Sequence, residues 1–192
     1  MSARIPVDLA KCYRLLNHGP TVIVSSAHAG RINLMSAAWS MPLDFAPPKV
    51  AVVIDKSTFT RELVEASGEF VLNVPSTRLA RLTLEVGAES GRTLDKFAVH
   101  AIAHTAGAQV AAPLIDGCLG WLECRLIREP HLQETYDLFL GEVVAAWADP
   151  EVFDGAHWTV EAGGKRSIHY VAGGHFFEIG APFYAGDADS GE

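Results

Sequence analysis

Short apolar runs, each bounded by glycine or proline, follow one another along this chain with little helical sequence between them. Runs rich in β-branched and aromatic residues are typical of strands. Most of them are neighbours in the sequence, so they favour a mainly β fold, an antiparallel barrel with helical insertions, over a doubly wound parallel sheet. The predicted strands are residues 21–27, 31–40, 49–55, 69–74, 118–128, 136–147, 168–171 and 176–179.

Three segments carry the apolar spacing of short helices. The first covers residues 7–16. The second opens at Ser57 and is ended by Gly68, and the third is capped by Ser76 or Thr77 and stops before Gly87. We therefore expect these short helices to lie between strands along the chain and not to form a separate layer.

Prolines predict a loop over Met41–Pro48, because proline cannot donate to a strand ladder. The run at 49–55 is almost wholly apolar, which indicates a strand that is buried on both faces. The sequence thus predicts an exposed loop followed directly by a core strand.

The predicted strands 118–128 and 136–147 alternate apolar and polar residues and can pair as a long antiparallel hairpin through residues 129–135. Glu123 and Arg125 share one face of the first strand. The simplest interpretation is that this face is solvated, because charged side chains are seldom buried.

The chain has 192 residues, 49% of them hydrophobic, which suits a single domain over 1–192 with an N-terminal segment 1–18 and an acidic tail 181–192. The net charge of −8 argues against nucleic acid or an anionic membrane as partner. No apolar stretch is long enough to span a bilayer, and the first residues lack a signal-peptide pattern. Three cysteines without a CxxC motif are typical of buried thiols in a reducing cytoplasm.

Motifs that would place catalysis on side chains are missing from the sequence. There is no GxGxxG, P-loop or GxSxG motif, and His100 and His104 are not part of an HExxH motif. We therefore expect no catalytic side chain and no metal site, and any chemistry should belong to a bound cofactor.

Residues 31–41 are unusually rich in small side chains. Such a strand lets a flat ligand approach the backbone closely, while Asn33 offers an amide and Trp39 an aromatic face. This favours a strand whose backbone N–H and C=O groups bind a planar cofactor, although an ordinary strand packed on a helix has the same pattern. The small residues are Ser36, Ala37, Ala38 and Ser40.

Ser57, Thr58 and Thr60 open a predicted helix directly after a buried strand. Unpaired N–H groups, the helix dipole and three hydroxyls predict a monophosphate seat, although the same residues serve as a plain N-cap. Lys96, in a polar loop with a glycine, is a candidate to balance a phosphate or a reduced ring, or else a solvated loop lysine.

In this order, six segments resemble the flavin reductase-like family of the FMN-binding split barrel, which includes flavoredoxin. Together they cover most of residues 20–180. They read INLMSAAWSMPLDFAPPKVAVVI, STFTRELVEASGEFVLNVP, SGRTLDKF, APLIDGCLGWLECRL, YDLFLGEVVAA and GGHFFEIG.

The resemblance implies a six-stranded Greek-key barrel and a homodimer with flavin near its interface. Tyr136 stands where many relatives have a histidine, which puts the contact at that corner in doubt. The positions that match flavin-contacting residues of the family are Asn33, Met35, Ser36, Ala37, Ala38, Trp39, Ser57, Thr58, Thr60, Lys96 and Phe176.

The activity that follows is reduction of FMN by NADH or NADPH through hydride transfer to flavin N5, with FAD as an alternative flavin. A flavin-dependent monooxygenase component is the expected user of the reduced flavin. Two other functions stay open at this point: a flavoredoxin-like electron carrier, and a flavin-free β-barrel binding module.

Overall fold

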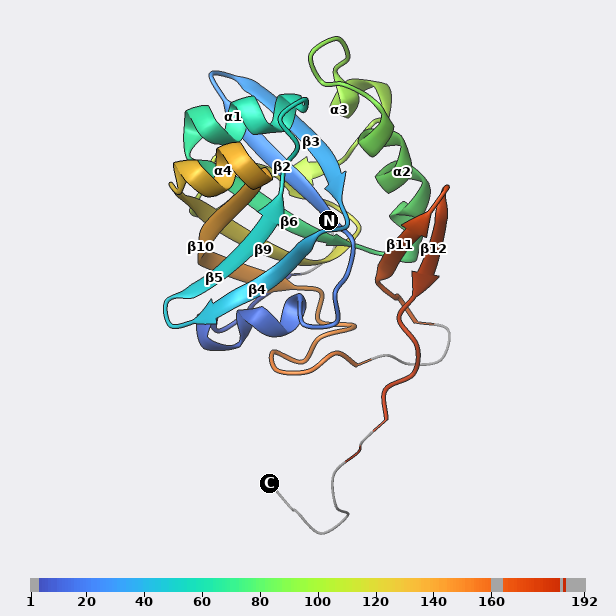
Figure 1. The fold of residues 1–192 in the computed structure, drawn as a ribbon. Coiled ribbons are helices and arrows are strands. Elements are labelled where there is room, and N and C mark those ends of the chain that lie inside the picture. The colour runs from blue at the N-terminus through green and yellow to red at the C-terminus, as the bar shows by residue number, and fades with distance from the viewer. Residues whose placement is uncertain (1–3, 160–163, 184, 186–192) are drawn as a thin grey trace.

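The computed structural model describes residues 4–159, 164–183 and 185, and the fold that it shows is mainly β (Figure 1). The acidic residues of the predicted tail, Asp187, Asp189 and Glu192, lie outside the described residues. None of the helices in the described part has the length and apolar character needed to cross a membrane.

The strands are β1 (Ile5–Pro6), β2 (Val22–His28), β3 (Arg31–Ala37), β4 (Ser40–Phe45), β5 (Pro48–Val53), β6 (Glu69–Pro75), β7 (His104–Thr105), β8 (Leu114–Ile115), β9 (Cys118–Ile127), β10 (Leu138–Ala148), β11 (Ile168–Ala172) and β12 (His175–Glu178). The α-helices are α1 (Phe59–Ser67), α2 (Ala80–Ala88), α3 (Lys96–Val99) and α4 (Pro130–Tyr136). Two 3₁₀ helices complete the set, η1 (Leu9–Leu15) and η2 (Thr77–Leu79).

One antiparallel sheet forms the body of the molecule, with the strand order β3-β2-β6-β9-β10-β5-β4 and β1 added to β10. Its two edge strands, β3 and β4, are consecutive in the chain and meet at Ala38 and Trp39. The sheet therefore curls back on itself, and the barrel is split between its two ends. Counted as one interrupted strand, β3 and β4 leave six strands around the barrel, which confirms the predicted fold.

Two hydrophobic cores lie on opposite faces of this sheet. Val24 and Leu72 belong to the core inside the barrel, whereas Ile23 and Val71 belong to an outer core beneath α2, α3 and the segment before β9. Strands β2 and β6 are therefore buried on both faces, which explains the unbroken apolar runs Val22–Val24 and Phe70–Leu72 within them.

The predicted loop Met41–Pro48 is wrong, because most of it forms β4 and the start of β5. Pro42 stands opposite Val50 in the β4–β5 pair. A proline is tolerated here because β4 is an edge strand and lacks a second neighbour that would need its N–H.

The long hairpin of β9 and β10 is confirmed, although its connection contains α4, so Tyr136 ends a helix and does not begin a strand. The prediction that the face of β9 with Glu123 and Arg125 is exposed to solvent is wrong at Glu123. Glu123 is fully buried, whereas Arg125 is exposed. The Glu123 carboxylate accepts backbone N–H groups of the loop that covers it. These donors are Ala108, Gln109 and Val110, with the indole of Trp147 as a fourth.

The three predicted helices begin close to where the sequence places them and differ mainly in type and extent, whereas α3 and α4 were not among them. Thr58 caps α1, and Gly68 ends it in the left-handed conformation with φ 73°. The segment after Ser76 starts as η2 and continues as α2 to Ala88, so Gly87 lies inside the last turn. The predicted helix at 7–16 is the 3₁₀ helix η1.

Candidate cofactor groove along strand β3

Two clefts meet along β3, the edge strand of the sheet, and they share Ser36, Gly87 and Ala88 in their walls. The α1 cleft, of about 230 Å³, lies between β3, the start of α1 and the segment after α2. The hairpin cleft, of about 330 Å³, lies between β3, α2 and the hairpin β11–β12. Because the walls are continuous, the two form one groove, which we call the β3 groove.

Two glycines bring the end of α2 and the following loop down onto β3. A Cβ atom on Gly87 would lie 2.1 Å from the Ser36 hydroxyl, and one on Gly91 would lie 2.2 Å from the Asn33 amide oxygen. Any larger residue would push this wall away from the strand. The sequence interpretation used Gly87 only as a helix stop and missed this role, for which the two closely spaced glycines are the available signal.

Lys96 is buried in the wall of the α1 cleft, with 3% of its surface exposed. Its ammonium group donates to the carbonyl oxygens of Leu34, at 2.8 Å, and Val86, at 2.6 Å. No carboxylate of the described residues lies within 4.0 Å of it. Burial lowers the pKa of Lys96 to about 8, and the charge of Glu89 opposes this shift.

The Leu34 carbonyl that Lys96 reaches identifies which groups of β3 point toward the groove. In an extended strand the N–H and C=O groups of alternate residues point to the same edge. Ser36 therefore shares the direction of Leu34 and presents its backbone donor and acceptor along the β3 groove, while Ala38, just beyond the end of β3, lines the hairpin cleft.

The first turn of α1 forms one end of the groove, where Ser57, Thr58 and Thr60 line the α1 cleft. The Thr58 hydroxyl accepts a hydrogen bond from the N–H of Arg61 at 3.3 Å. Thr58 is therefore the N-cap of α1, as the plain N-cap interpretation of these residues predicts. The unpaired N–H groups of this turn also lie at the cleft, together with the positive end of the helix dipole.

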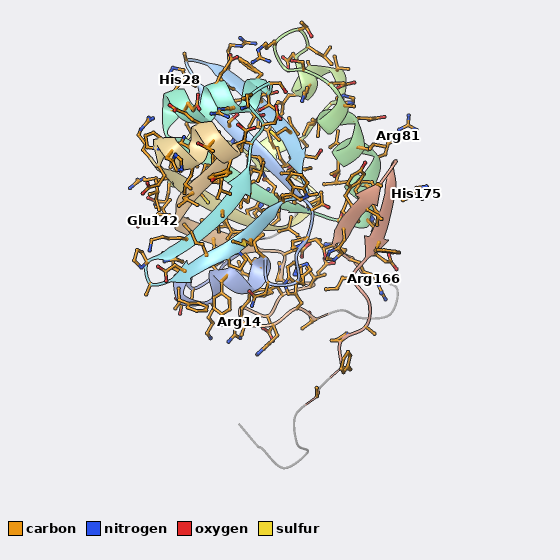
Figure 2. All side chains as sticks on the ribbon, viewed as in Figure 1. Arg14, His28, Arg81, Glu142, Arg166 and His175 are labelled. Carbon is orange, nitrogen blue, oxygen red and sulfur yellow. The ribbon has the colours of Figure 1, made fainter. Side chains whose placement is uncertain are left out.

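An aromatic pair forms the other end of the groove. Tyr170 and Phe176 face each other across the hairpin β11–β12, with ring centroids 5.3 Å apart, and both line the hairpin cleft. The hairpin lies beside α2 (Figure 1), and its tip carries His175, which points away from the body (Figure 2). Tyr170 was not identified from the sequence, because its role depends on the pairing of β11 with β12.

The structure brings eight of the twelve predicted site residues to the groove wall. The other four include Asn33, which lies one layer behind with 3% of its surface exposed and donates to the Thr60 hydroxyl at 3.0 Å. The eight that line the wall are Met35, Ser36, Ala38, Ser57, Thr58, Thr60, Lys96 and Phe176.

Ala37, Trp39 and Tyr136 do not line either cleft. The side chain of Ala37 packs in the core inside the barrel. Trp39 is 74% exposed at the junction of β3 and β4, and Tyr136 is exposed at the end of α4. Within one protomer, these three side chains therefore lie outside the wall of the β3 groove.

The groove matches the chemistry of a flavin mononucleotide. A flavin has an anionic phosphate at one end and a flat ring with a hydrogen-bonding edge at the other. The α1 cleft offers helix N–H groups and a buried cation, and the hairpin cleft offers aromatic cover. The backbone edge at Ser36, which lines both clefts, lies between them.

Comparisons with known proteins show the family to which the chain belongs. The sequence model of the family described as Flavin reductase like domain matches residues 13–167. The chain is 43% identical over 189 residues to the uncharacterised protein YddH of Escherichia coli (strain K12), with 97% of this chain and 100% of that protein covered.

Solved structures show the same fold. A crystal structure of an FMN-binding domain of a flavin reductases-like enzyme from Shewanella baltica has a TM-score of 0.93 and 47% identity, with 96% of this chain and 98% of that chain covered. The flavoredoxin of Desulfovibrio vulgaris (Miyazaki F) has a TM-score of 0.74 and 25% identity, with 90% and 91% covered. The chain therefore belongs to the flavin reductase-like domain family, whose fold is an FMN-binding split barrel.

Proposed function

We propose that this protein is a flavin-dependent oxidoreductase in which NADH or NADPH reduces FMN bound in the β3 groove. The observation that carries the proposal is the continuity of that groove from the start of α1 to the aromatic pair of the hairpin. The Shewanella baltica structure, an FMN-binding domain at 47% identity, supports the choice of flavin.

Each end of the groove has a distinct task in this proposal. The first turn of α1, with Ser57 and Thr58, holds the phosphate, and Lys96 supplies the balancing positive charge. Phe176 covers one face of the ring, while Ser36 and Ala38 offer backbone hydrogen bonds to its polar edge. A bound flavin supplies the acceptor for the nicotinamide hydride, so these residues need only orient and stabilise it.

We further propose that the protein is a homodimer that forms through the β4 edge. Large apolar side chains there are exposed, which is unusual for an edge strand of a monomer. Because Trp39 lies at the same edge, pairing of two copies would bring it toward a ring that its own protomer leaves uncovered. The exposed residues are Trp39, Met41, Leu43 and Phe45.

The test of the activity is the visible spectrum of the purified protein with added FMN, followed by anaerobic addition of NADH and then NADPH. We expect quenching of flavin fluorescence on binding, and bleaching of the flavin absorbance by one of the two nucleotides with repeated turnover. Binding without bleaching by either nucleotide contradicts the reductase proposal and selects the electron carrier, which the similarity to flavoredoxin favours.

A protein that neither quenches nor binds FMN contradicts both flavin functions and leaves the flavin-free binding module. If reductase activity is present, free reduced flavin in the filtrate would be available to a separate monooxygenase component. Flavin retained on the protein instead argues against such a partner.

The three cysteines are free and buried, as expected for a protein of the reducing cytoplasm.

A further inference from the structure

The segment that forms the α1 end of the β3 groove is tied at both ends to one residue outside the groove, Asp137. This segment, residues 54–61, connects β5 to the first turn of α1, and we call it the phosphate segment. The backbone carbonyl of Asp137 accepts the N–H of Ile54 at 2.9 Å, and its carboxylate pairs with the guanidinium of Arg61 at 2.5 Å. The ammonium of Lys56, within the segment, lies 3.9 Å from the same carboxylate. Asp137 itself lines neither cleft of the groove.

Arg61 is buried where α1 lies beside α4 (Figure 1), with 9% of its surface exposed. Besides the pair with Asp137, its guanidinium donates to the Gln133 carbonyl oxygen at 2.9 Å and to the Glu65 carboxylate at 2.8 Å. The guanidinium carbon lies 5.2 Å from the centroid of the Phe139 ring. Because all three guanidinium nitrogen atoms are engaged, the Arg61 side chain fixes the first turn of α1 relative to the barrel.

Asp137 has the left-handed backbone conformation, with φ 55°, at the residue that ends α4. This turn brings its carbonyl oxygen to the residue after β5 and its carboxylate to α1. Aspartate and asparagine tolerate the left-handed conformation better than most residues that carry a side chain. Asp137→Asn therefore removes the negative charge without straining the backbone.

We propose that Asp137, acting through Arg61, is a positioning residue for the phosphate of the bound flavin. This inference rests on the proposed function and concerns the placement of its phosphate seat. The N–H groups of the first turn of α1 bind an anion well only when they converge on it, because hydrogen bonds weaken steeply with misalignment. The ion pair with Arg61 orients that turn, whereas the negative charge of Asp137 by itself repels a phosphate. Positioning and charge therefore change flavin affinity in opposite directions.

The test is a fluorescence titration of the flavin-free wild type and Asp137→Asn with FMN and with riboflavin, which lacks the phosphate. We expect the wild type to bind FMN more tightly than riboflavin. Asp137→Asn should weaken FMN binding about five- to tenfold, which corresponds to part of one charge-assisted hydrogen bond, and riboflavin binding less than about twofold. If Asp137 acted only through its charge, the same variant would bind FMN more tightly than the wild type.

Asp116→Asn is the matched control, because Asp116 forms an ion pair of the same length, 2.5 Å, with Arg4. Its side chain is 22% exposed, against 16% for Asp137, and it lines neither cleft of the groove. Both asparagine variants should lower the urea midpoint of unfolding, because each leaves a largely buried arginine without its partner. Asp116→Asn should keep the wild-type affinity for both flavins.

Arg61→Lys is an independent variant that keeps the positive charge but loses the planar fork, so it should reproduce the loss of FMN affinity. The double variant with Asp137→Asn should lose little more, because both changes break the same contact. Arg61→Lys carries the same test if Asp137→Asn does not fold.

Equal loss of FMN and riboflavin affinity in Asp137→Asn overturns the positioning role, because the ion pair then supports only the fold. Unchanged or tighter FMN binding overturns it as well, as does a wild type that binds FMN and riboflavin equally. A wild type that binds neither flavin overturns the proposed function itself. The two failures are therefore distinguishable in the same titration.

Discussion

Lys96 keeps its charge with two neutral carbonyl oxygens as partners, at the wall where a phosphate or a reduced ring would lie. The sequence alternative of a solvated loop lysine is wrong, because α3 and the end of α2 bury it. A buried ammonium group without a carboxylate is costly, and an anionic ligand would relieve that cost. Its role toward flavin stays a prediction.

That prediction has a pH signature. The pKa of Lys96 is about 8, so the side chain is charged below pH 8 and neutral above it. A phosphate binds the charged form better, so flavin affinity should fall about tenfold between pH 7 and pH 9 if only that form binds. Titration of FMN at several pH values measures this change. Lys96→Met should bind weakly with little pH dependence, and a pH-independent wild type contradicts the assignment.

Thr58 serves both the stability of α1 and the proposed phosphate seat. Removing its hydroxyl in Thr58→Ala leaves the N–H of Arg61 without its cap, which should lower the free energy of unfolding by about 1 kcal/mol. Flavin affinity should fall as well. Thr58→Ser retains both properties. Urea unfolding with and without FMN separates the two effects, and an unchanged alanine variant would show that the cap is dispensable.

At the scale of secondary-structure elements, the site depends on how closely the loop after α2 approaches β3. Gly91→Ala would place a Cβ atom 2.2 Å from the Asn33 amide oxygen and 2.6 Å from its carbonyl carbon. That amide is buried and held by Thr60, so the loop must move instead.

We expect Gly91→Ala to reduce the free energy of unfolding by about 1–3 kcal/mol and to weaken flavin binding. Gly180→Ala is the control, since nothing lies within 4 Å of its Cβ position. Chemical unfolding and FMN titration measure both effects. Wild-type values for Gly91→Ala would mean that the close contact at Asn33 does not shape the groove.

At the scale of the whole molecule, the split barrel leaves an apolar edge at β4 that the fold does not cover. Met41→Glu places a carboxylate there and should convert the proposed homodimer into a monomer, because two such charges would lie near the interface. Light scattering with size-exclusion chromatography gives the mass. Val99→Glu, an exposed apolar position on α3, should leave the dimer intact. A monomeric wild type rules the homodimer out.

Local patterns determined much of this protein from its sequence. Alternation and β-branched runs specify the barrel strands, and the Thr58 and Gly68 caps specify α1, because these signals act within a few residues. The small residues of β3 likewise predicted a backbone edge for a ligand. Trp39 and Tyr136 were predicted to contact flavin, but within one protomer they lie outside the groove.

Other features were decided only by the tertiary structure. Glu123 is buried because a loop beyond β7 wraps over it, and Lys96 is buried because two carbonyls from separate elements converge on it. Met41–Pro48 contains a strand because β5 is there to pair with it. In each case the deciding contact forms only when another segment folds against the residue. The periodicity of the local sequence therefore carries no information about that contact.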